Sequence, residues 1–338
     1  MNSQRSSNIA LFAITSVLLV ALLTSCGPEE DENLYSADNQ PQDIHSSGDG
    51  DNGDNGDNGE SDGDSSGDSA PEEPLLRDYR GPLGPSDREV TPALPREYDE
   101  AGNHPLLLLL HGIGSNASQT IAFFGVSQIA SQAGYLVLAP EGTIDSANRR
   151  FWNATSRCCD FDNTGVDDVG YLSNLIDEAI EKYAVDPDQI YIMGLSNGGF
   201  MAHRLACDHG DKIRAIVSFN GGTTISAASC APEHPVYLFH VHSTADTTVP
   251  YTASLLAPSA RDAVTRWADW NQCDPAPRSA PNINATATIP GNETTVEVWE
   301  NCMEGGGVEF WSLQGAAHVP FPLADFPEEI MNSLQNLR

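Results

Sequence analysis

The chain contains 338 residues, with 48 acidic and 16 basic side chains, so its formal net charge is −32. A protein this acidic does not hold a phosphate backbone by bulk electrostatics, which excludes a nucleic-acid-binding role. With 40% apolar residues and 22 prolines, the sequence is neither a coiled coil nor disordered throughout.

The first 25 residues have the features of an export signal. Arg5 precedes an apolar run over residues 9–23, which is too short to span a bilayer comfortably and is typical of a signal-peptide core. Small residues then lead to Cys26, which resembles the bacterial lipobox, where the cysteine is acylated. We therefore predict a signal peptide over 1–25 and lipid attachment at Cys26, which would hold the exported protein to a membrane at the cell surface or in the periplasm. Ordinary secretory cleavage, which would leave the protein extracellular, is the alternative.

An acidic segment follows. Residues 27–76 contain 16 Asp or Glu and no Lys or Arg, and residues 49–59 repeat Asp-Asn-Gly. This composition predicts a disordered, self-repelling tether over 26–74, because so few apolar residues cannot offset the entropy cost of folding. A calcium site is the alternative, but the carboxylates recur every third residue rather than at the alternating positions of a calcium loop.

Residues 75–338 form the predicted globular domain, long enough for one full hydrophobic core. Apolar runs predict strands at 106–110, 135–139, 190–193, 215–219, 236–242 and 308–313. Helical patterns lie at 118–133, 169–183, 198–208, 260–271 and 328–337. This alternation predicts a mostly parallel sheet with helices on both faces. The proline-rich segment 77–104 has no strand pattern, so the first edge of the sheet stays unassigned.

Ser196 is the predicted nucleophile. It lies in Gly194-Leu-Ser-Asn-Gly198, directly after a predicted strand and before a predicted helix. Glycines on either side allow a turn tight enough to lift the Ser196 hydroxyl above the sheet, and the helix directs its amides at the same point. A glycine-rich turn with a surface serine is the alternative interpretation.

A serine hydroxyl needs a base that is itself oriented by a carboxylate. His318 follows the last predicted strand in a loop, where it can reach the serine, and is the predicted base. His203 and His209 lie on the helix after Ser196 and cannot turn back to it. Asp246 follows the strand over 236–242, so it lies at the ligand-binding edge of the sheet and is the predicted carboxylate, with an Asx turn as its alternative role.

Two backbone amides are predicted to stabilise the oxyanion that develops during acyl transfer. One belongs to Asn197, next to the nucleophile, and the other to Ile113, in the loop after the strand over 106–110. His111 in the same loop is expected to order that loop.

The six cysteines after Cys26 predict three disulfides, because their number is even and the chain is exported. Cys273 and Cys302 flank a polar excursion, which a bridge between them would tie down. Cys158 and Cys159 are expected to bond to separate partners, sharing Cys207 and Cys230 in an order left open.

No metal or cofactor is expected. The cysteines lack C-x-x-C spacing for zinc. His240 and His242 could form a metal pair, but no cysteine or carboxylate lies near them in sequence, which favours packed strand histidines.

The sequence from about residue 105 to 322 resembles the secreted α/β-hydrolases known as polyhydroxybutyrate depolymerases and the feruloyl and acetyl-xylan esterases of carbohydrate esterase family 1. The matching segments are Leu110-His-Gly112, Cys158-Cys159, Val166-Asp-Asp-Val-Gly170-Tyr171, Gly194-Leu-Ser-Asn-Gly-Gly-Phe-Met-Ala202, Thr244-Ala-Asp246-Thr-Thr-Val-Pro-Tyr251, Cys302 and Gly315-Ala-Ala-His318. The resemblance implies an α/β-hydrolase fold and Ser196, Asp246 and His318 as a triad. Two departures leave substrate choice open: Ser243 stands where the family usually has glycine, and Pro320-Phe-Pro322 where it commonly has Trp-Pro.

We therefore expect a serine esterase that forms an acyl-enzyme on an ester substrate, possibly a polymer such as a plant polysaccharide ester or a polyester. A peptidase is disfavoured, because the residues after Ser196 match the esterases. The alternative from another class is an inactive hydrolase-fold lipoprotein that binds glycans or proteins.

Overall fold

The computed structural model describes residues 80–337, which are built around an eight-stranded sheet. The predicted signal peptide (1–25), the lipid-attachment residue Cys26 and the predicted tether (26–74) lie outside the described residues. Within the described part of the chain, no helix is long and apolar enough to cross a membrane.

The sheet is mostly parallel, with an antiparallel pair at one edge. Its strand order is β2-β1-β5-β6-β7-β10-β9-β8, and the pairs from β2 through β10 are parallel. The strands are β2 (Leu136–Leu138), β1 (His104–Leu110), β5 (Val185–Leu195), β6 (Ala215–Phe219), β7 (Tyr237–Ser243), β10 (Gly307–Leu313), β9 (Thr294–Trp299) and β8 (Arg278–Ile283). A separate hairpin pairs β3 (Thr143–Ile144) with β4 (Arg150–Phe151).

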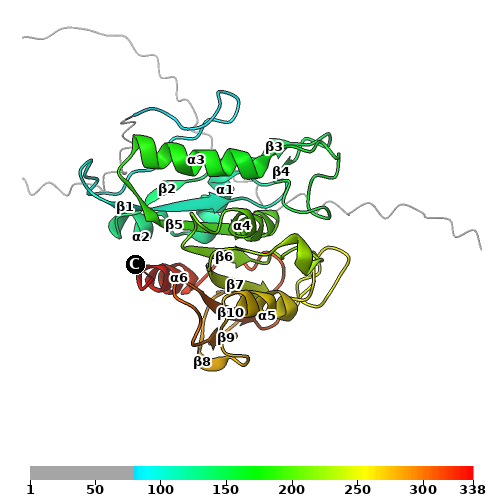
Figure 1. The fold of residues 1–338 in the computed structure, drawn as a ribbon. Coiled ribbons are helices and arrows are strands. Elements are labelled where there is room, and N and C mark those ends of the chain that lie inside the picture. Colours follow the sequence, from blue (N-terminus) through cyan, green and yellow to red (C-terminus); the bar gives the residue numbers. More distant parts are fainter. Residues whose placement is uncertain (1–79, 338) are drawn as a thin grey trace, which may run out of the picture. The chain divides into compact units, whose positions relative to one another are not determined.

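Helices cover both faces of this sheet (Figure 1), which confirms the predicted α/β-hydrolase arrangement. One face carries α3 (Asp168–Lys182), α4 (Asn197–Asp208) and α5 (Ala260–Trp270), and the other carries α1 (Ala117–Phe124), α2 (Ser127–Gln132) and α6 (Phe326–Gln335).

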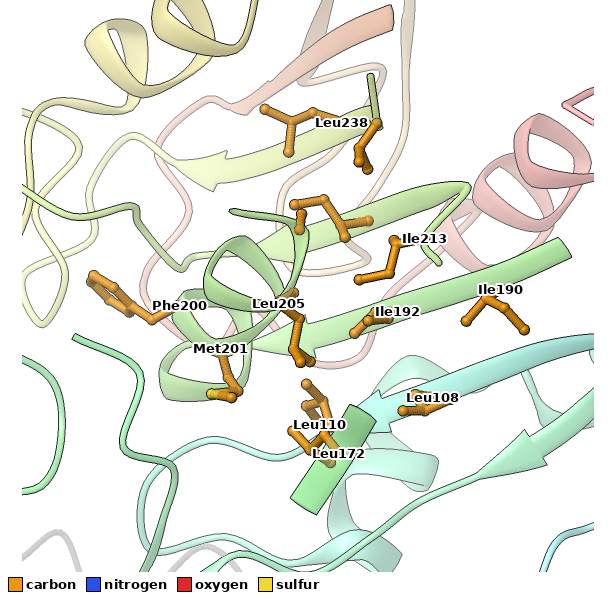
Figure 2. Packing of buried hydrophobic residues seen from close by; sticks show 14 of the residues in the cluster. Leu108, Leu110, Leu172, Ile190, Ile192, Phe200, Met201, Leu205, Ile213 and Leu238 are labelled. Atoms are coloured by element: carbon orange, nitrogen blue, oxygen red, sulfur yellow. The ribbon is translucent and has the colours of Figure 1, made fainter. Parts of the chain in front are cut away.

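The leucine run of β1 serves both faces, because successive side chains of a strand point to opposite sides. Leu106, Leu108 and Leu110 enter the cluster under α3 and α4, whereas Leu107 and Leu109 enter the opposite cluster. Figure 2 shows the first cluster, in which Met201 and Leu205 of α4 lie over the strands. The uninterrupted apolar run therefore reflects burial on both faces.

The structure differs from the sequence prediction at two places and supplies the sheet edge that the sequence left unassigned. The helix expected over 118–133 is two helices, because Gly125 ends α1 in a left-handed conformation (φ 63°). The polar excursion over 273–302 contains strands β8 and β9, which extend the sheet. The edge strand is β2, and Ala93 from the proline-rich segment pairs with Val137 on its outer side.

The outer strand β8 is mostly exposed and includes Pro281. Its pairing with β9 shifts register between Ala280 and Ile283. A proline lacks a backbone N–H, so it is tolerated in a sheet mainly at such an edge.

Three disulfides are present in the described residues, and one expectation about their pairing was wrong. Cys273 and Cys302 are joined, as predicted. Cys158 and Cys159, expected to have separate partners, are joined to each other across a cis peptide. Cys207 at the end of α4 lies beside Cys230, with 5.2 Å between their Cα atoms, so these two bond together and are not available to Cys158 and Cys159.

The Cys273–Cys302 bridge is expected to stabilise the fold. Replacing both residues with serine should lower the free energy of unfolding by about 3–4 kcal/mol, because the bridge closes a segment with a sequence separation of 29. Urea unfolding of the oxidised protein and of the double variant measures this difference. Equal midpoints with equal slopes would contradict the expectation.

Candidate active site

Ser196 occupies a strained turn between β5 and α4. Its backbone has φ 53° and ψ −117°, a combination that a non-glycine residue adopts only when its surroundings enforce it. A Cβ added to Gly194 would lie 2.1 Å from the carbonyl oxygen of Gly198, and one added to Gly198 would lie 2.1 Å from that of Leu110. Both positions therefore require glycine, which explains the local sequence around the serine.

Ser196, His318 and Asp246 form a continuous hydrogen-bonded series. The Ser196 hydroxyl lies 2.9 Å from His318 Nε2, and His318 Nδ1 lies 2.6 Å from Asp246 Oδ2. The three residues follow β5, β10 and β7, whose carboxyl ends lie at the same edge of the sheet. The fold thus brings together the three residues that the sequence predicts as a triad.

The Asp246 carboxylate has two different sets of partners. Oδ1 accepts hydrogen bonds from the amides of Thr248 (2.8 Å) and Val249 (2.9 Å), which is an Asx-type turn, while Oδ2 accepts from His318. The Asx turn and the contact with His318, posed as alternatives for this residue, are therefore both present. The turn leaves only Oδ2 for the imidazole and fixes the direction in which this oxygen points.

Asn220 positions the His318 loop and was not identified from the sequence. Its side-chain amide donates to the His318 carbonyl oxygen (2.6 Å) and to the Ser243 hydroxyl (3.1 Å), and its carbonyl oxygen accepts from the Ser243 amide. Asn220 is fully buried and has a positive φ of 47°. Its one sequence signal is its place directly after a buried strand. Ser243, a departure from the family pattern, supplies one of its partners.

The loop of Ile113 lies beside the nucleophile. A Cβ added to Gly112 would lie 3.5 Å from Ser196 Cβ, so the backbone of this loop passes close to the serine. In the described part of the chain, the Ile113 amide donates no hydrogen bond. Asn197 is the first residue of α4, where amides have no partner within the helix. Their role as oxyanion donors stays a prediction.

The Asn197 side chain binds the loop that carries the vicinal disulfide. Its Oδ1 accepts from the Trp152 amide (2.7 Å), and its Nδ2 donates to the Trp152 carbonyl oxygen (2.9 Å) and lies 3.6 Å from Cys158 Sγ. The Trp152 indole in turn donates to the His111 carbonyl oxygen (3.0 Å). The residue after the nucleophile therefore joins this loop to the turn at Ser196, a contact that no local sequence pattern indicates.

His111 orders the loop before Ile113. Its Nε2 accepts from the Gly142 amide (2.9 Å), so Nδ1 carries the proton and donates to the Gly112 carbonyl oxygen (2.8 Å). Burial lowers the pKa of His111 to about 4. This histidine therefore stays neutral at physiological pH and cannot act as a charged group.

Within residues 80–337, no cluster of His, Cys, Asp or Glu has a geometry that could hold a metal ion. His240 and His242 lie on one side of β7 and contact each other, with 3.2 Å between His240 Nε2 and His242 Nδ1.

A strained serine turn, a histidine–carboxylate pair and a parallel sheet with helices on both faces together define an α/β-hydrolase. A family model described as Phospholipase/Carboxylesterase matches residues 97–273. The chain belongs to this family.

Relatives and solved structures agree with the resemblance expected from the sequence. Feruloyl esterase B of Piromyces equi is 28% identical over 69% of this chain and 42% of its own length. Poly(3-hydroxybutyrate) depolymerase of Ralstonia pickettii is 32% identical over 36% of this chain and 26% of its own. The chain thus spans less than half the length of either relative. The structure of an acetyl xylan esterase from Aspergillus awamori superposes on this protein with a TM-score of 0.56 and 14% sequence identity. The superposition covers 79% of this chain and 98% of the esterase chain, which indicates a shared fold.

Asn197→Ala should destabilise the protein by about 1–3 kcal/mol, because it leaves the amide of buried Trp152 without a partner and removes one of the hydrogen bonds to its carbonyl oxygen. Urea unfolding measures the loss. Asn332→Ala, at an exposed position of α6, is the matched control and should change stability by less than about 0.5 kcal/mol. Equal stabilities of the two variants would show that the side-chain contact with Trp152 contributes nothing.

His111 should make the protein less stable in acid. The unfolded chain takes up a proton on this residue below the ordinary histidine pKa of 6.5, whereas the folded protein does so only near 4, so stability is lost as the pH falls between these values. We expect His111 to account for a loss of about 2 kcal/mol between pH 7 and pH 5. Urea unfolding of wild type and His111→Gln at both pH values tests this. The variant should lose less stability on acidification, and an equal loss in both proteins would refute the assignment.

Proposed function

We propose that this protein is a serine esterase that hydrolyses carboxylic esters through an acyl-enzyme. The observation that carries the proposal is the hydrogen-bonded series from the Ser196 hydroxyl through His318 to Asp246. Membership of the Phospholipase/Carboxylesterase family supports the same reaction.

Each member of the series has one role. Ser196 Oγ attacks the ester carbonyl carbon while His318 Nε2 accepts the hydroxyl proton, and the imidazolium then donates that proton to the leaving alcohol. Asp246 holds the His318 Nδ1 proton, so that Nε2 faces the serine, and stabilises the imidazolium. Water then attacks the acyl-enzyme with His318 as base, which releases the acid and restores Ser196.

The developing oxyanion is held by the amides of Ile113 and Asn197. Both belong to segments fixed against Ser196, one by the neutral His111 and the other by the start of α4. Donors held in place before the reaction need no reorganisation when the negative charge forms, and each is worth about 2.7–4 kcal/mol in related chemistry.

The proposed substrates are feruloyl or acetyl-xylan esters or polyhydroxyalkanoates, in keeping with the relatives. Val319 and Phe321, directly after His318, have 49% and 46% of their surface exposed. They offer apolar surface next to the base for the acyl or alcohol part of such a substrate. A polymeric ester would be met outside the cell, which agrees with the proposed signal peptide, lipid attachment at Cys26 and acidic tether. No cofactor takes part in this reaction scheme.

Ser196→Ala should lower kcat by a factor of about 10⁴ or more, because the acyl-enzyme cannot form. p-Nitrophenyl acetate, methyl ferulate and a hydroxybutyrate oligomer are the substrates to be tested in parallel. Ser218→Ala is the matched control, since this buried serine hydroxyl makes no hydrogen bond in the described part of the chain. We expect it to retain wild-type turnover.

The substrate comparison separates the candidate functions. Serine-dependent preference for ferulate indicates plant cell-wall breakdown, and preference for the oligomer indicates a polyester depolymerase. Activity that survives Ser196→Ala would overturn the triad assignment. Folded protein that turns over none of the three substrates, yet binds glycans equally well with and without Ser196, would instead favour the binding role.

A further inference from the structure

We infer that three buried histidines, His203, His240 and His242, form a directed hydrogen-bonded series that positions Asp246 for catalysis. This inference rests on the proposed function, because it concerns the carboxylate of the proposed triad. The three residues are assigned no part in the reaction scheme above, and His240 and His242 were expected from the sequence only to pack inside the sheet.

The series crosses the layer between the helices and the sheet. It begins at Trp267 of α5, whose Nε1 lies 2.9 Å from His203 Nδ1 on α4. The next two rings belong to His240 and His242 of β7. His203 Nε2 lies 3.3 Å from His240 Nδ1, and His240 Nε2 lies 3.2 Å from His242 Nδ1. His242 Nε2 ends the series, 2.9 Å from the carbonyl oxygen of Val249.

The two ends of the series determine where every proton lies. An indole N–H can only donate and a carbonyl oxygen can only accept, so His203 Nδ1 accepts from Trp267 and His242 Nε2 donates to Val249. Between these ends, one arrangement of neutral rings satisfies every contact, with the proton of each histidine on Nε2. All the N–H dipoles then point along the series toward the Asp246 loop.

The three rings remain neutral. Burial lowers the pKa of His203 to about 3 and that of His240 well below its usual value, and it also lowers the pKa of His242. Geometry gives the same answer, because an extra proton on any ring would set one N–H against another. Neutral rings therefore satisfy every contact of the series.

The last contact of the series reaches the proposed triad through one residue. The Val249 carbonyl oxygen accepts from His242, and the Val249 amide donates to Asp246 Oδ1. His242 Nε2 also lies 3.7 Å from Asp246 Oδ2, the oxygen that binds His318. The positive end of the final N–H dipole therefore lies close to the carboxylate, and the turn that holds Asp246 is fixed from its inner side.

The role of the series is positioning rather than proton transfer. It ends on the carbonyl oxygen of Val249, which cannot take up a proton and pass it on. Apolar side chains of similar volume would fill this face without the cost of burying three imidazoles. They could not bond the Val249 carbonyl oxygen, so the turn at Asp246 would lose its inner support.

The central ring gives the sharpest test. His240→Leu removes both hydrogen bonds at the middle of the series, whereas the amide of His240→Gln can still accept from one neighbour and donate to the other. We expect His240→Leu to lower kcat on p-nitrophenyl acetate about tenfold or more, with KM changed less than twofold, because Asp246 and His318 lose their alignment. His240→Gln should recover most of the lost kcat.

His104→Leu is the matched control. His104 is also buried and bonded to backbone, with its Nδ1 3.1 Å from the Gly134 carbonyl oxygen. It is the first residue of β1, at the amino ends of the parallel strands, whereas the triad lies at their carboxyl ends. The His104→Leu variant should be less stable than wild type, while its kcat stays near the wild-type value. If His240→Leu cannot be obtained folded, Trp267→Phe replaces it. Phenylalanine keeps an aromatic ring at this position but lacks the indole N–H that begins the series. This variant too should lower kcat at constant KM.

A spectroscopic measurement tests the series without any turnover. Nitrogen-15 imidazole spectra of the wild-type protein should show three neutral rings with the proton on Nε2. The NMR resonance of the proton between His318 Nδ1 and Asp246 should change its chemical shift in His240→Leu but not in His104→Leu. Rings found with the proton on Nδ1, or a folded His240→Leu or Trp267→Phe variant with kcat within twofold of wild type, would overturn the inference.

Failure of this inference differs from failure of the proposed function. If Ser196→Ala abolishes turnover and His240→Leu does not reduce it, the positioning role alone is wrong. If turnover survives Ser196→Ala, the triad is wrong, whatever the ring spectra show.

Discussion

The site depends on one close contact between backbones, at the point where the first turn of α4 meets the end of β1. Gly198 approaches the carbonyl oxygen of Leu110 so closely that no side chain fits between them. This approach forces the strained turn at Ser196 and brings the Gly112 backbone next to it. The buried leucines of β1 and the apolar face of α4 hold the two elements together, so packing of the core supplies the energy that keeps the serine strained.

Around this contact, a buried polar side chain positions each of three loops of the site. Asn197 binds the vicinal-disulfide loop, His111 the loop of Ile113, and Asn220 the loop of His318. Each of them bonds backbone groups, so it fixes the path of a loop rather than one rotamer. Buried polar groups are costly unless they are fully bonded, which makes such an arrangement rigid.

Much of the fold and the three central residues could be predicted from the sequence, and physical reasons set the limit. Apolar runs such as 106–110 indicate buried strands, and the order of Ser196, Asp246 and His318 along the chain follows the parallel sheet. The contacts of Asn197 and Asn220 join segments distant in sequence, so no local pattern reports them. The pairing of Cys158 with Cys159 was missed because it depends on Cys207 and Cys230 meeting across the end of α4.

The two edges of the sheet bear on how copies of this protein meet. An unpaired strand edge can recruit a strand from a neighbouring molecule, which is a common start of aggregation. At β2, the outer hydrogen bonds of Val137 are taken by Ala93. At β8, Pro281 lacks a donor and the register shift breaks the regular spacing. Both margins of the domain are therefore poor templates for strand addition, which disfavours the joining of sheets between two copies of the domain.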